Sequence, residues 1–325
     1  MQLEKANGAY RACRIPGLVA TPEGTLIACY ECRKGDPSDW AEIDLKIIRS
    51  RDKGDSWETV ALFCGNGETL NNPVLIAEGQ MIHFLFCKNY KQVFYAVSKD
   101  DGKSFSEPVE IKPFENADFF YNVAALGPGH GIFHGGKLLI PVWFAYNREN
   151  PKAHHPSFVH TLCSKDGGKT WFLGARIPDA DLVDPNESAL APTADGGVMI
   201  SIRSESPARC RAIATSPNGI EGWSRPILCS DLRDPVCQGS VIPYGDFLLH
   251  INCDSEAKRK NLTVKVLDRE LGVLHALVVD AVGGYSDLAV IGDDLCVLYE
   301  RGALHGMGDL CFERILLHTV FENTN

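Results

Sequence analysis

The chain contains 325 residues, of which 45% are hydrophobic and 23% charged, so it can bury the core of one large domain or two ordinary ones. Its formal net charge of −10 argues against nucleic acid as a partner, because phosphate binding needs a concentrated basic face. No apolar run approaches the roughly 20 residues of a membrane-spanning helix, and the N-terminus lacks the apolar core of a signal peptide, so we expect a cytoplasmic protein that binds no membrane.

Short β-rich segments separated by turn residues recur along the whole chain, while long amphipathic helical patterns are hard to find. In chain order, the segments are 25–31, 45–50, 80–86, 93–98, 137–144, 159–164, 197–204, 247–252, 262–267, 287–291 and 295–300. Regularly spaced short strands are typical of an all-β sandwich, barrel or propeller.

A sequence repeat decides between these architectures. The pattern Ser-x-Asp-x-Gly-x-Ser/Thr-aromatic occurs at 50–57, 98–105 and 164–171, with a degenerate fourth copy at 215–223. Each copy follows a β-rich segment and reads as a hairpin turn, in which Asp accepts hydrogen bonds from free backbone N–H groups and Gly supplies a positive φ. The copies start 48, 66 and about 51 residues apart, which suits one four-stranded antiparallel sheet per repeat. We therefore predict a six-bladed β-propeller that uses residues 1–325 as a single domain.

The twelve cysteines read best as reduced, buried small hydrophobic residues. Cys29 and Cys32 form the only CxxC motif, and an offset of three residues puts them on opposite faces of a strand. We find no second pair or histidines at zinc-ligand spacing, so we expect neither a metal nor another cofactor.

The tetrapeptide Cys13-Arg14-Ile15-Pro16 precedes the three well-formed boxes. Together these motifs resemble those of the exo-sialidases (neuraminidases), Asp-box or BNR-repeat proteins that fold as six-bladed propellers and remove terminal sialic acid. The segments 127–141 and 297–302 resemble two further stretches of the family. The resemblance implies a glycoside hydrolase that retains configuration through a covalent Tyr intermediate.

The resemblance also implies three arginines that bind the substrate carboxylate. They are Arg14, Arg203, which follows Glu187 by sixteen residues, and Arg259, with Arg211 and Lys258 as alternatives for the third. A sialoside carries a carboxylate on its anomeric carbon, and planar guanidinium groups bind carboxylates through paired hydrogen bonds.

The catalytic residues follow from the same resemblance. The segment Tyr285-Ser286-Asp287-Leu288 supplies the nucleophile Tyr285, which a base, Glu187, must deprotonate because the pKa of a phenol is about 10. A neutral phenol also avoids the repulsion that a carboxylate nucleophile would meet from the substrate's own carboxylate. The general acid/base is Asp39, with Asp36 as the alternative.

Other positions are assigned to substrate contacts or support. Arg33 is expected near C4 of the sugar, and Glu300 is expected to pair with Arg14. Asn72 stands where the family often has an Asp that contacts the sugar near C4. Candidates for the pocket of the N-acetyl group are Phe119, Phe120, Trp143 and Phe144.

These residues favour an exo-α-sialidase whose partners are sialylated glycans. Two alternatives stay open at this point. One is a hydrolase of another 2-keto-3-deoxy sugar acid, such as Kdn, Kdo or a pectin-derived ulosonic acid, all of which carry the same carboxylate. The other is an inactive propeller that binds glycans. The sequence does not determine the linkage preference, the choice between hydrolase and trans-sialidase, or the oligomeric state.

Overall fold

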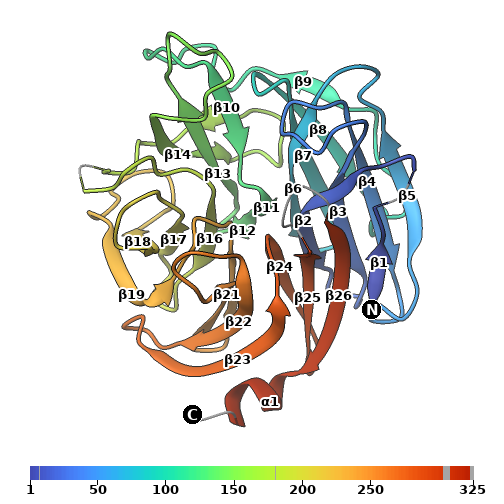
Figure 1. Ribbon diagram of the computed structural model, residues 1–325, viewed down its shortest axis with the longest axis vertical. Helices are drawn as coiled ribbons and strands as arrows, with labels where there is room; N and C mark the ends of the chain where they lie inside the picture. Colours follow the sequence, from blue (N-terminus) through green and yellow to red (C-terminus); the bar gives the residue numbers. More distant parts are fainter. Residues whose placement is uncertain (7, 180, 303–307, 323–325) are drawn as a thin grey trace.

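The computed structural model describes residues 1–6, 8–179, 181–302 and 308–322, and these residues are almost entirely β-structure. Within them, strands that are antiparallel except for the pair β11 and β6 form six small sheets, and the one helix is α1 (Leu317–Glu322). The sheets are arranged around a central axis as the blades of a propeller (Figure 1). The predicted all-β six-bladed propeller is therefore confirmed.

The first three blades are built in chain order. Blade 1 contains β2 (Ala12–Ala20), β3 (Leu26–Arg33), β4 (Ile43–Ser50) and β5 (Glu58–Phe63). Blade 2 contains β6 (Leu70–Glu78), β7 (Met81–Lys88), β8 (Gln92–Ser98) and β9 (Val109–Ile111), and the short β11 (Gly129–His130) pairs with β6. Blade 3 contains β10 (Val123–Leu126), β13 (Lys137–Ala145), β14 (Ser157–Ser164) and β15 (Phe172–Leu173), and β12 (Ile132–His134) pairs with β13.

The last three blades each have four strands. Blade 4 contains β16 (Ser188–Pro192), β17 (Val198–Ile202), β18 (Cys210–Ser216) and β19 (Ile227–Arg233). Blade 5 contains β20 (Ser240–Tyr244), β21 (Phe247–Cys253), β22 (Lys260–Leu267) and β23 (Val273–Val282). Blade 6 contains β24 (Ser286–Ile291), β25 (Asp294–Arg301), β26 (Asp309–Leu316) and, from the other end of the chain, β1 (Gln2–Glu4).

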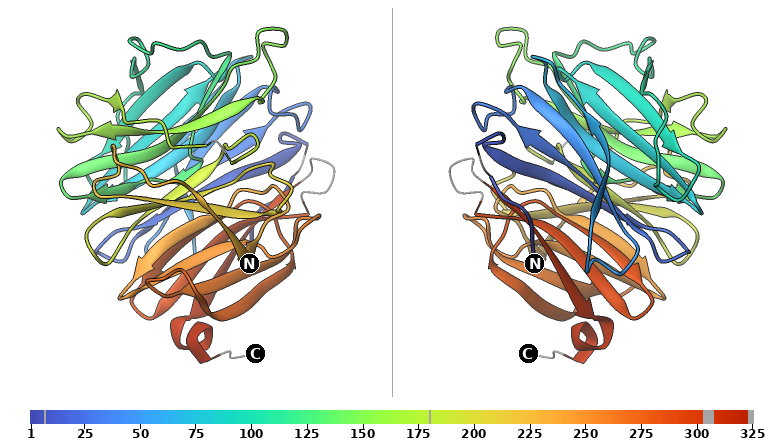
Figure 2. Two further views of the ribbon diagram at one scale, coloured as in Figure 1. Left: turned by 90° about the vertical axis from the view of Figure 1, so that its left-hand side faces the viewer. Right: turned by 90° about the vertical axis from the view of Figure 1, so that its right-hand side faces the viewer.

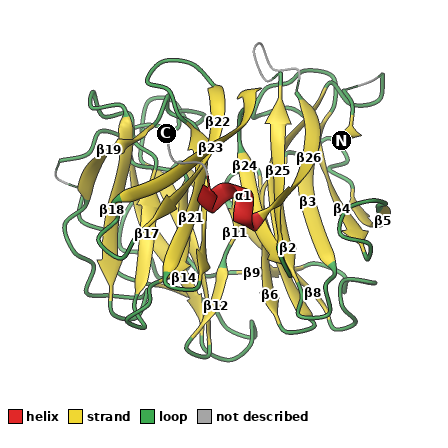
Figure 3. Ribbon diagram, turned by 90° about the horizontal axis from the view of Figure 1, so that it is seen from below, coloured by secondary structure: helices red, strands yellow, loops and turns green. Residues whose placement is uncertain are grey.

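The pairing of β1 with β26 closes the ring, because it joins the first residues of the chain to its last blade. In Figure 2 the N-terminal strand lies beside the red strands of blade 6. Helix α1 packs against β22, β23 and β26 (Figure 3), and its residues Leu317 and Val320 are buried. No helix in the described ranges is long and apolar enough to cross a membrane.

The repeated boxes connect the third and fourth strands of blades 1 to 4, as their turn chemistry predicts. In the first box, Asp52 accepts a hydrogen bond from the Ser56 N–H (2.8 Å), and Ser50 Oγ accepts one from the Gly54 N–H (2.8 Å). In the degenerate fourth copy Asn218 replaces the Asp and accepts from the Ile220 N–H (2.8 Å). The boxes therefore stabilise turns.

The hydrophobic core lies between neighbouring blades, because each sheet buries both faces. Cys29 and Cys32 belong to two different core clusters on opposite sides of blade 1, as predicted for an offset of three. The expectation that all cysteines are buried is wrong for Cys64, which is exposed, and for Cys229, which is partly buried. Both lie near outer strands, where a blade has no further neighbour.

Candidate active site

A cavity of about 180 Å³ opens at one end of the propeller axis. Several blades contribute to its wall, each with residues near the start of its innermost strand and near the end of its second strand. The predicted residues that line it are Arg14, Arg33, Asp39, Asn72, Trp143, Glu187, Arg203, Arg259 and Tyr285. Positions up to 271 residues apart in the chain thus converge on one cavity.

Two irregular strands carry side chains into this cavity. The register of β2 shifts between Arg14 and Gly17, and the register of β6 shifts between Asn71 and Val74. Such β-bulges redirect a side chain at the end of a strand. Ile15, beside Arg14, has a φ of 58°, which is rare for a β-branched residue. The surrounding structure therefore holds the backbone of this bulge in a conformation that isoleucine disfavours.

Tyr285 and Glu187 are in direct hydrogen-bond contact in the cavity. The hydroxyl of Tyr285 donates to Oε2 of Glu187 at 2.5 Å, and Nη1 of Arg203 contacts both that oxygen and the Tyr285 hydroxyl, the latter at 3.0 Å. Arg259 and Arg14 lie over the Tyr285 ring, with Cζ at 5.0 and 5.2 Å from its centroid. Burial, and then the charge of Glu187, raises the pKa of Tyr285, while the three arginines lower it in part.

The second cluster of charges surrounds Asp39. Its Oδ1 lies 2.8 Å from Nη1 of Arg33 and 3.8 Å from Nη1 of Arg14. Burial raises the pKa of Asp39, but the charges of Arg33 and Arg14 outweigh burial and hold that pKa below its ordinary value. The Asp39 side chain is still 44% exposed, so a ligand in the cavity can reach it.

Arg14 and Arg33 are each held by a buried carboxylate. Glu300 lies 3.2 Å from Nε of Arg14 and also accepts the N–H of Ile15 at 2.9 Å, so the predicted contact between Glu300 and Arg14 is present. Glu31 accepts from Nε and Nη2 of Arg33 at 2.9 and 2.7 Å. Burial raises the pKa of Glu31, against the lowering effect of Arg33.

Arg259 differs from the other arginines of the cavity. Among the described residues it has no carboxylate within 4.0 Å, whereas Arg14 faces Glu300, Arg33 faces Glu31 and Arg203 faces Glu187. Its positive charge is therefore available to an anion. A protein with a net charge of −10 thus holds a local site that suits a carboxylate.

Several alternatives lie elsewhere. Arg211 is fully buried and paired with Asp234 at 3.1 Å, so it does not reach the cavity. Lys258 and Asp36 are exposed and do not line the cavity. Arg259 and Asp39 are therefore the residues that occupy the predicted places.

The aromatic candidates need a correction. Trp143 lines the cavity, but Phe144, its neighbour in β13, points to the opposite face and is buried in the core. Phe119 and Phe120 line a separate depression. The pattern of aromatic residues did not distinguish the two faces of blade 3, because β13 is buried on both of them.

Asn72 lines the cavity, but its amide is already bonded to protein. Nδ2 donates to the carbonyl of Leu126 at 3.0 Å, and Oδ1 accepts from Nδ2 of Asn71 at 2.9 Å. Its backbone N–H donates to Glu31 at 3.0 Å. Asn72 therefore helps to hold the wall of the cavity, and an incoming sugar would compete with these bonds.

The sequence interpretation assigned no role to several residues that line the cavity, among them Glu31, Tyr90 and His154. Glu31 carried a signal, since it lies two residues from Arg33 and so faces the same side of a strand. Tyr90 and His154 lie in a turn and a loop, where no periodicity indicates direction. Their rings pack together with centroids 5.0 Å apart.

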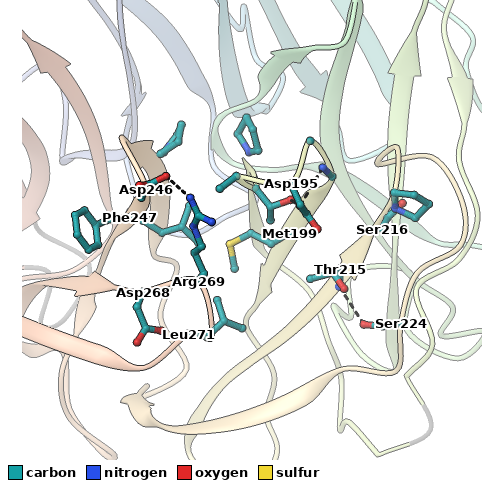
Figure 4. A pocket seen from close by; sticks show the side chains of 18 of the residues that line it. Asp195, Met199, Thr215, Ser216, Ser224, Asp246, Phe247, Asp268, Arg269 and Leu271 are labelled. Carbon is teal, nitrogen blue, oxygen red and sulfur yellow. Dashed lines mark hydrogen bonds and ion pairs between the residues drawn. The ribbon is translucent and has the colours of Figure 1, made fainter.

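A larger cavity, of about 680 Å³, lies between blades 4 and 5. It is formed by the hairpin turns at the other end of the strands, and its charged side chains are engaged locally (Figure 4). Arg269 pairs with Asp246 at 2.5 Å, and Asp268 accepts the N–H of Gly272 at 2.8 Å. It offers no convergent reactive groups, so the smaller axial cavity is the candidate active site.

Comparison with known proteins agrees with this choice. Residues 59–280, more than half of the chain, match the family described as BNR repeat-like domain. The chain belongs to the BNR repeat-like domain family. Among the relatives of this BNR protein is a sialidase of Bacteroides fragilis, 26% identical over 360 residues, which covers 96% of the chain and 63% of the relative. An exo-alpha-sialidase of Aspergillus fumigatus is 25% identical over 351 residues, which covers 91% of the chain and 78% of the relative.

Solved structures show the same fold. The Hadza microbial sialidase Hz136 matches with a TM-score of 0.81 and 24% identity over 96% of this chain and 67% of that one. The Trypanosoma rangeli sialidase matches with a TM-score of 0.76 and 19% identity over 98% of this chain and 58% of that one. This BNR protein therefore spans less than two thirds of the Bacteroides and Trypanosoma proteins.

Proposed function

We propose that this protein is an exo-α-sialidase, a glycoside hydrolase that removes terminal sialic acid from sialylated glycans. The observation that carries the proposal is the convergence of three guanidinium groups on the Tyr285–Glu187 pair in one cavity. Sialidase relatives over more than 90% of the chain support the same reaction class.

In the proposed Michaelis complex the three guanidinium groups bind the substrate carboxylate. Arg259 contributes the charge that has no protein carboxylate beside it, and Arg14 and Arg203 are fixed by Glu300 and Glu187. Paired hydrogen bonds to a carboxylate fix both its position and its plane. The anomeric carbon, which bears that carboxylate, is thereby held above the Tyr285 hydroxyl.

The first half of the proposed reaction forms a bond between Tyr285 and the sugar. Glu187 takes the phenolic proton, the phenolate oxygen attacks the anomeric carbon, and the bond to the leaving oxygen breaks as Asp39 protonates that oxygen. The 2.5 Å contact between Tyr285 and Glu187 supports the proton transfer. The raised pKa of Tyr285 explains why a base is needed.

The second half releases the sugar. Asp39, now a carboxylate, takes a proton from water, and the water oxygen attacks the anomeric carbon as the bond to Tyr285 breaks. Glu187 returns its proton to the phenolate. Both displacements invert the anomeric carbon, so the product retains the configuration of the substrate.

A release assay tests the proposal. We would incubate the protein with a fluorogenic α-sialoside and with matched Kdn, Kdo and pectin-derived ulosonic acid glycosides. The proposal predicts turnover of the sialoside. If only another ulosonic acid glycoside is hydrolysed, the substrate is a different sugar acid and the mechanism stays the same. If glycosides bind but none is hydrolysed, the propeller is inactive.

A second assay tests the nucleophile. Tyr285→Phe removes one oxygen and little volume, so it should keep inhibitor binding but lose at least about 10³-fold of kcat. Full activity in Tyr285→Phe would show that another group is the nucleophile.

A further inference from the structure

Blade 3 carries a second depression, of about 540 Å³, that the proposed reaction does not use. It lies at the same end of the strands as the candidate active site, because loop residues 118–120 precede β10 and Tyr146 and Arg148 follow β13. Its remaining lining residues are Phe158, His160 and Arg176.

The surface of this depression is aromatic and partly open to solvent. Phe120 is 44% exposed and Tyr146 is 41% exposed. Below them, the ring of Phe119 stacks on that of His160 with centroids 5.4 Å apart, and Tyr146 lies 5.6 Å from Phe158. Apolar side chains on a protein surface usually occur singly, whereas several exposed rings gathered in one hollow are typical of a binding site.

The polar groups around these rings include both hydrogen-bond donors and hydrogen-bond acceptors. The guanidinium of Arg148 lies 4.3 Å over the Phe120 ring and has no acidic partner among the described residues. The guanidinium of Arg176 lies 4.4 Å over Phe158 and pairs with Asp179 at 2.6 Å. The carboxylate of Asp118 lines the same depression and is an acceptor.

His160 supplies a second acceptor. The residue is buried, with 8% of its surface exposed, and its Nδ1 donates to the carbonyl of Gly174 at 2.9 Å. Nε2 then carries no proton and has no partner in the part of the chain that the structure describes. Burial lowers the pKa of His160, which favours the neutral ring.

The combination of groups selects among ligand classes. An apolar ligand would leave Nε2 of His160 unpaired. A phosphate would be attracted by the two guanidinium groups but would offer only acceptors to Nε2 of His160 and to the Asp118 carboxylate, which are acceptors themselves. A sugar satisfies all groups, because its hydroxyls both donate and accept while its C–H face packs on aromatic rings.

The depression is also linked to the candidate active site by one loop. Residues 146–156 present Tyr146 and Arg148 to the depression and His154 to the axial cavity. The Asn122 side chain fixes this loop: it accepts the N–H of Asn147 at 2.6 Å and donates to the carbonyl of Ala153 at 2.8 Å.

We infer that the depression on blade 3 binds a neutral hexopyranose unit of a glycan beside the candidate active site. The assignment of that unit to a sialylated glycan rests on the proposed function, whereas the binding of a neutral sugar does not. Glycans that extend from the axial cavity across loop 146–156 would make this additional contact, and short substrates would not.

Saturation-transfer NMR with lactose and a neutral galactose-ended tetrasaccharide tests the site directly, on the full chain. We expect transfer to the sugar C–H protons, and loss of most of that transfer in Phe120→Ala and Tyr146→Ala. Phe133→Ala is the matched control, because Phe133 is also an exposed aromatic residue (41%) but lies in β12 at the opposite end of the strands. Thermal unfolding verifies that all three variants fold.

Kinetics provide the second test. Phe120→Ala and Tyr146→Ala should raise KM for a sialylated oligosaccharide about 3- to 10-fold and leave KM for a small aryl sialoside unchanged. Absence of transfer in the wild type, or equal transfer in the wild type and both variants, would overturn the inference. Sugar binding without turnover of either sialoside would instead overturn the proposed function and leave this site standing.

Discussion

Asp39 is a carboxylate between two guanidinium groups, and that environment sets the pH at which it can donate a proton. Burial raises its pKa, but Arg33 and Arg14 hold the pKa below its ordinary value. The protonated fraction that general acid catalysis needs therefore grows as the pH falls. A substrate carboxylate bound to Arg14 cancels part of the positive charge, so the pKa of Asp39 should rise in the complex.

This environment predicts a shifted pH profile for Arg33→Gln. Removing one positive charge should move the alkaline limb of kcat/KM to higher pH by about one unit, since an adjacent opposite charge lowers a carboxyl pKa by roughly that amount or more. The measurement is kcat/KM against pH for the wild type and the variant. An alkaline limb at the same pH in both proteins would show that Asp39 is not the acid seen in the profile. Asp39→Asn is the control, because it should lose this limb.

Arg14 should contribute strongly to the binding of flat sugar acids. A 2,3-unsaturated sialic acid is planar at C2 and keeps its carboxylate, so it resembles the oxocarbenium-like transition state and should bind more tightly than the free product. Arg14→Ala should raise its inhibition constant about 10- to 100-fold, because a charged paired hydrogen bond contributes roughly 1.5–3 kcal/mol. Arg51→Ala, at an exposed arginine in the first box, is the control. An unchanged constant in Arg14→Ala would place the carboxylate elsewhere.

The sequence predicted much of the site at this scale because its motifs surround single residues. Arg14, Glu187 and Tyr285 each lie in a recognisable tetrapeptide or at a fixed spacing. His154 and Tyr90 do not, although both line the cavity. A loop residue such as His154 acquires its position only from the tether at Asn122, which joins distant segments and leaves no local pattern.

At the scale of elements, each box of blades 1 to 4 places its glycine against the preceding blade. A Cβ at Gly54 would lie 2.2 Å from Phe312 of blade 6, and one at Gly102 would lie 2.1 Å from Ile27 of blade 1. The boxes thus require glycine for two reasons, the positive φ and the close approach of the preceding blade.

A pair of variants separates the two reasons. Gly54 and Gly67 have φ of 92° and 88°, but a Cβ at Gly67 would meet no atom within 4 Å. Gly54→Ala should therefore lower the free energy of unfolding by about 1–3 kcal/mol more than Gly67→Ala, through displacement of the rigid Phe312 ring. Urea unfolding measures the difference. Equal losses would mean that the box tolerates a side chain at the blade interface.

The β-rich segments of the sequence predicted mainly the second and third strands of the blades, whereas the shortest strands and some longer ones, such as β6, β23 and β26, escaped prediction. β9, β11, β12 and β15 have two or three residues each, too few for an alternating pattern to emerge. The bulges in β2 and β6 were not predicted either. Both depend on buried carboxylates from other strands, Glu300 and Glu31, which bond the bulged backbone.

At the scale of the whole molecule, one buried carboxylate ties several blades together at the axis. Asp287 of blade 6 accepts hydrogen bonds from the Leu18 N–H of blade 1 (2.8 Å), from Ser240 of blade 5 (2.6 Å) and from His130 of β11 (2.6 Å). Burial lowers the pKa of His130, but the charge of Asp287 outweighs burial and raises it. Asp287 thus stabilises the protonated form of His130 relative to an imidazole in water.

Asp287→Ala should destabilise the whole ring. It leaves three donors on three other strands without their acceptor, and breaking a buried ion pair costs about 3–5 kcal/mol. Chemical unfolding should show one cooperative transition at lower denaturant, with Asp287→Asn affected less because the amide oxygen still accepts. A loss of under about 1 kcal/mol in Asp287→Ala would show that the blades are held by their apolar interfaces alone.

The repeats predicted the number of blades but not the way in which the ring closes. β1 has three residues, with no periodicity to suggest that it completes blade 6 beside β26. That pairing joins the two ends of the described chain, and only the closed geometry of six blades requires it. The same geometry brings Arg14 of blade 1 next to Glu300 of blade 6.

The measurement that tests the central proposal most directly is the identity of the residue that bonds to the sugar. A 2,3-difluoro sialic acid would transfer its sugar to the nucleophile, and the fluorine at C3 would slow release by destabilising the positively charged transition state. After digestion, mass spectrometry should find the added sugar on the peptide that contains Tyr285, and Tyr285→Phe should show no adduct. An adduct on another residue would contradict the proposed mechanism. Hydrolysis of the fluorosugar without any adduct, in samples quenched during turnover, would contradict it as well.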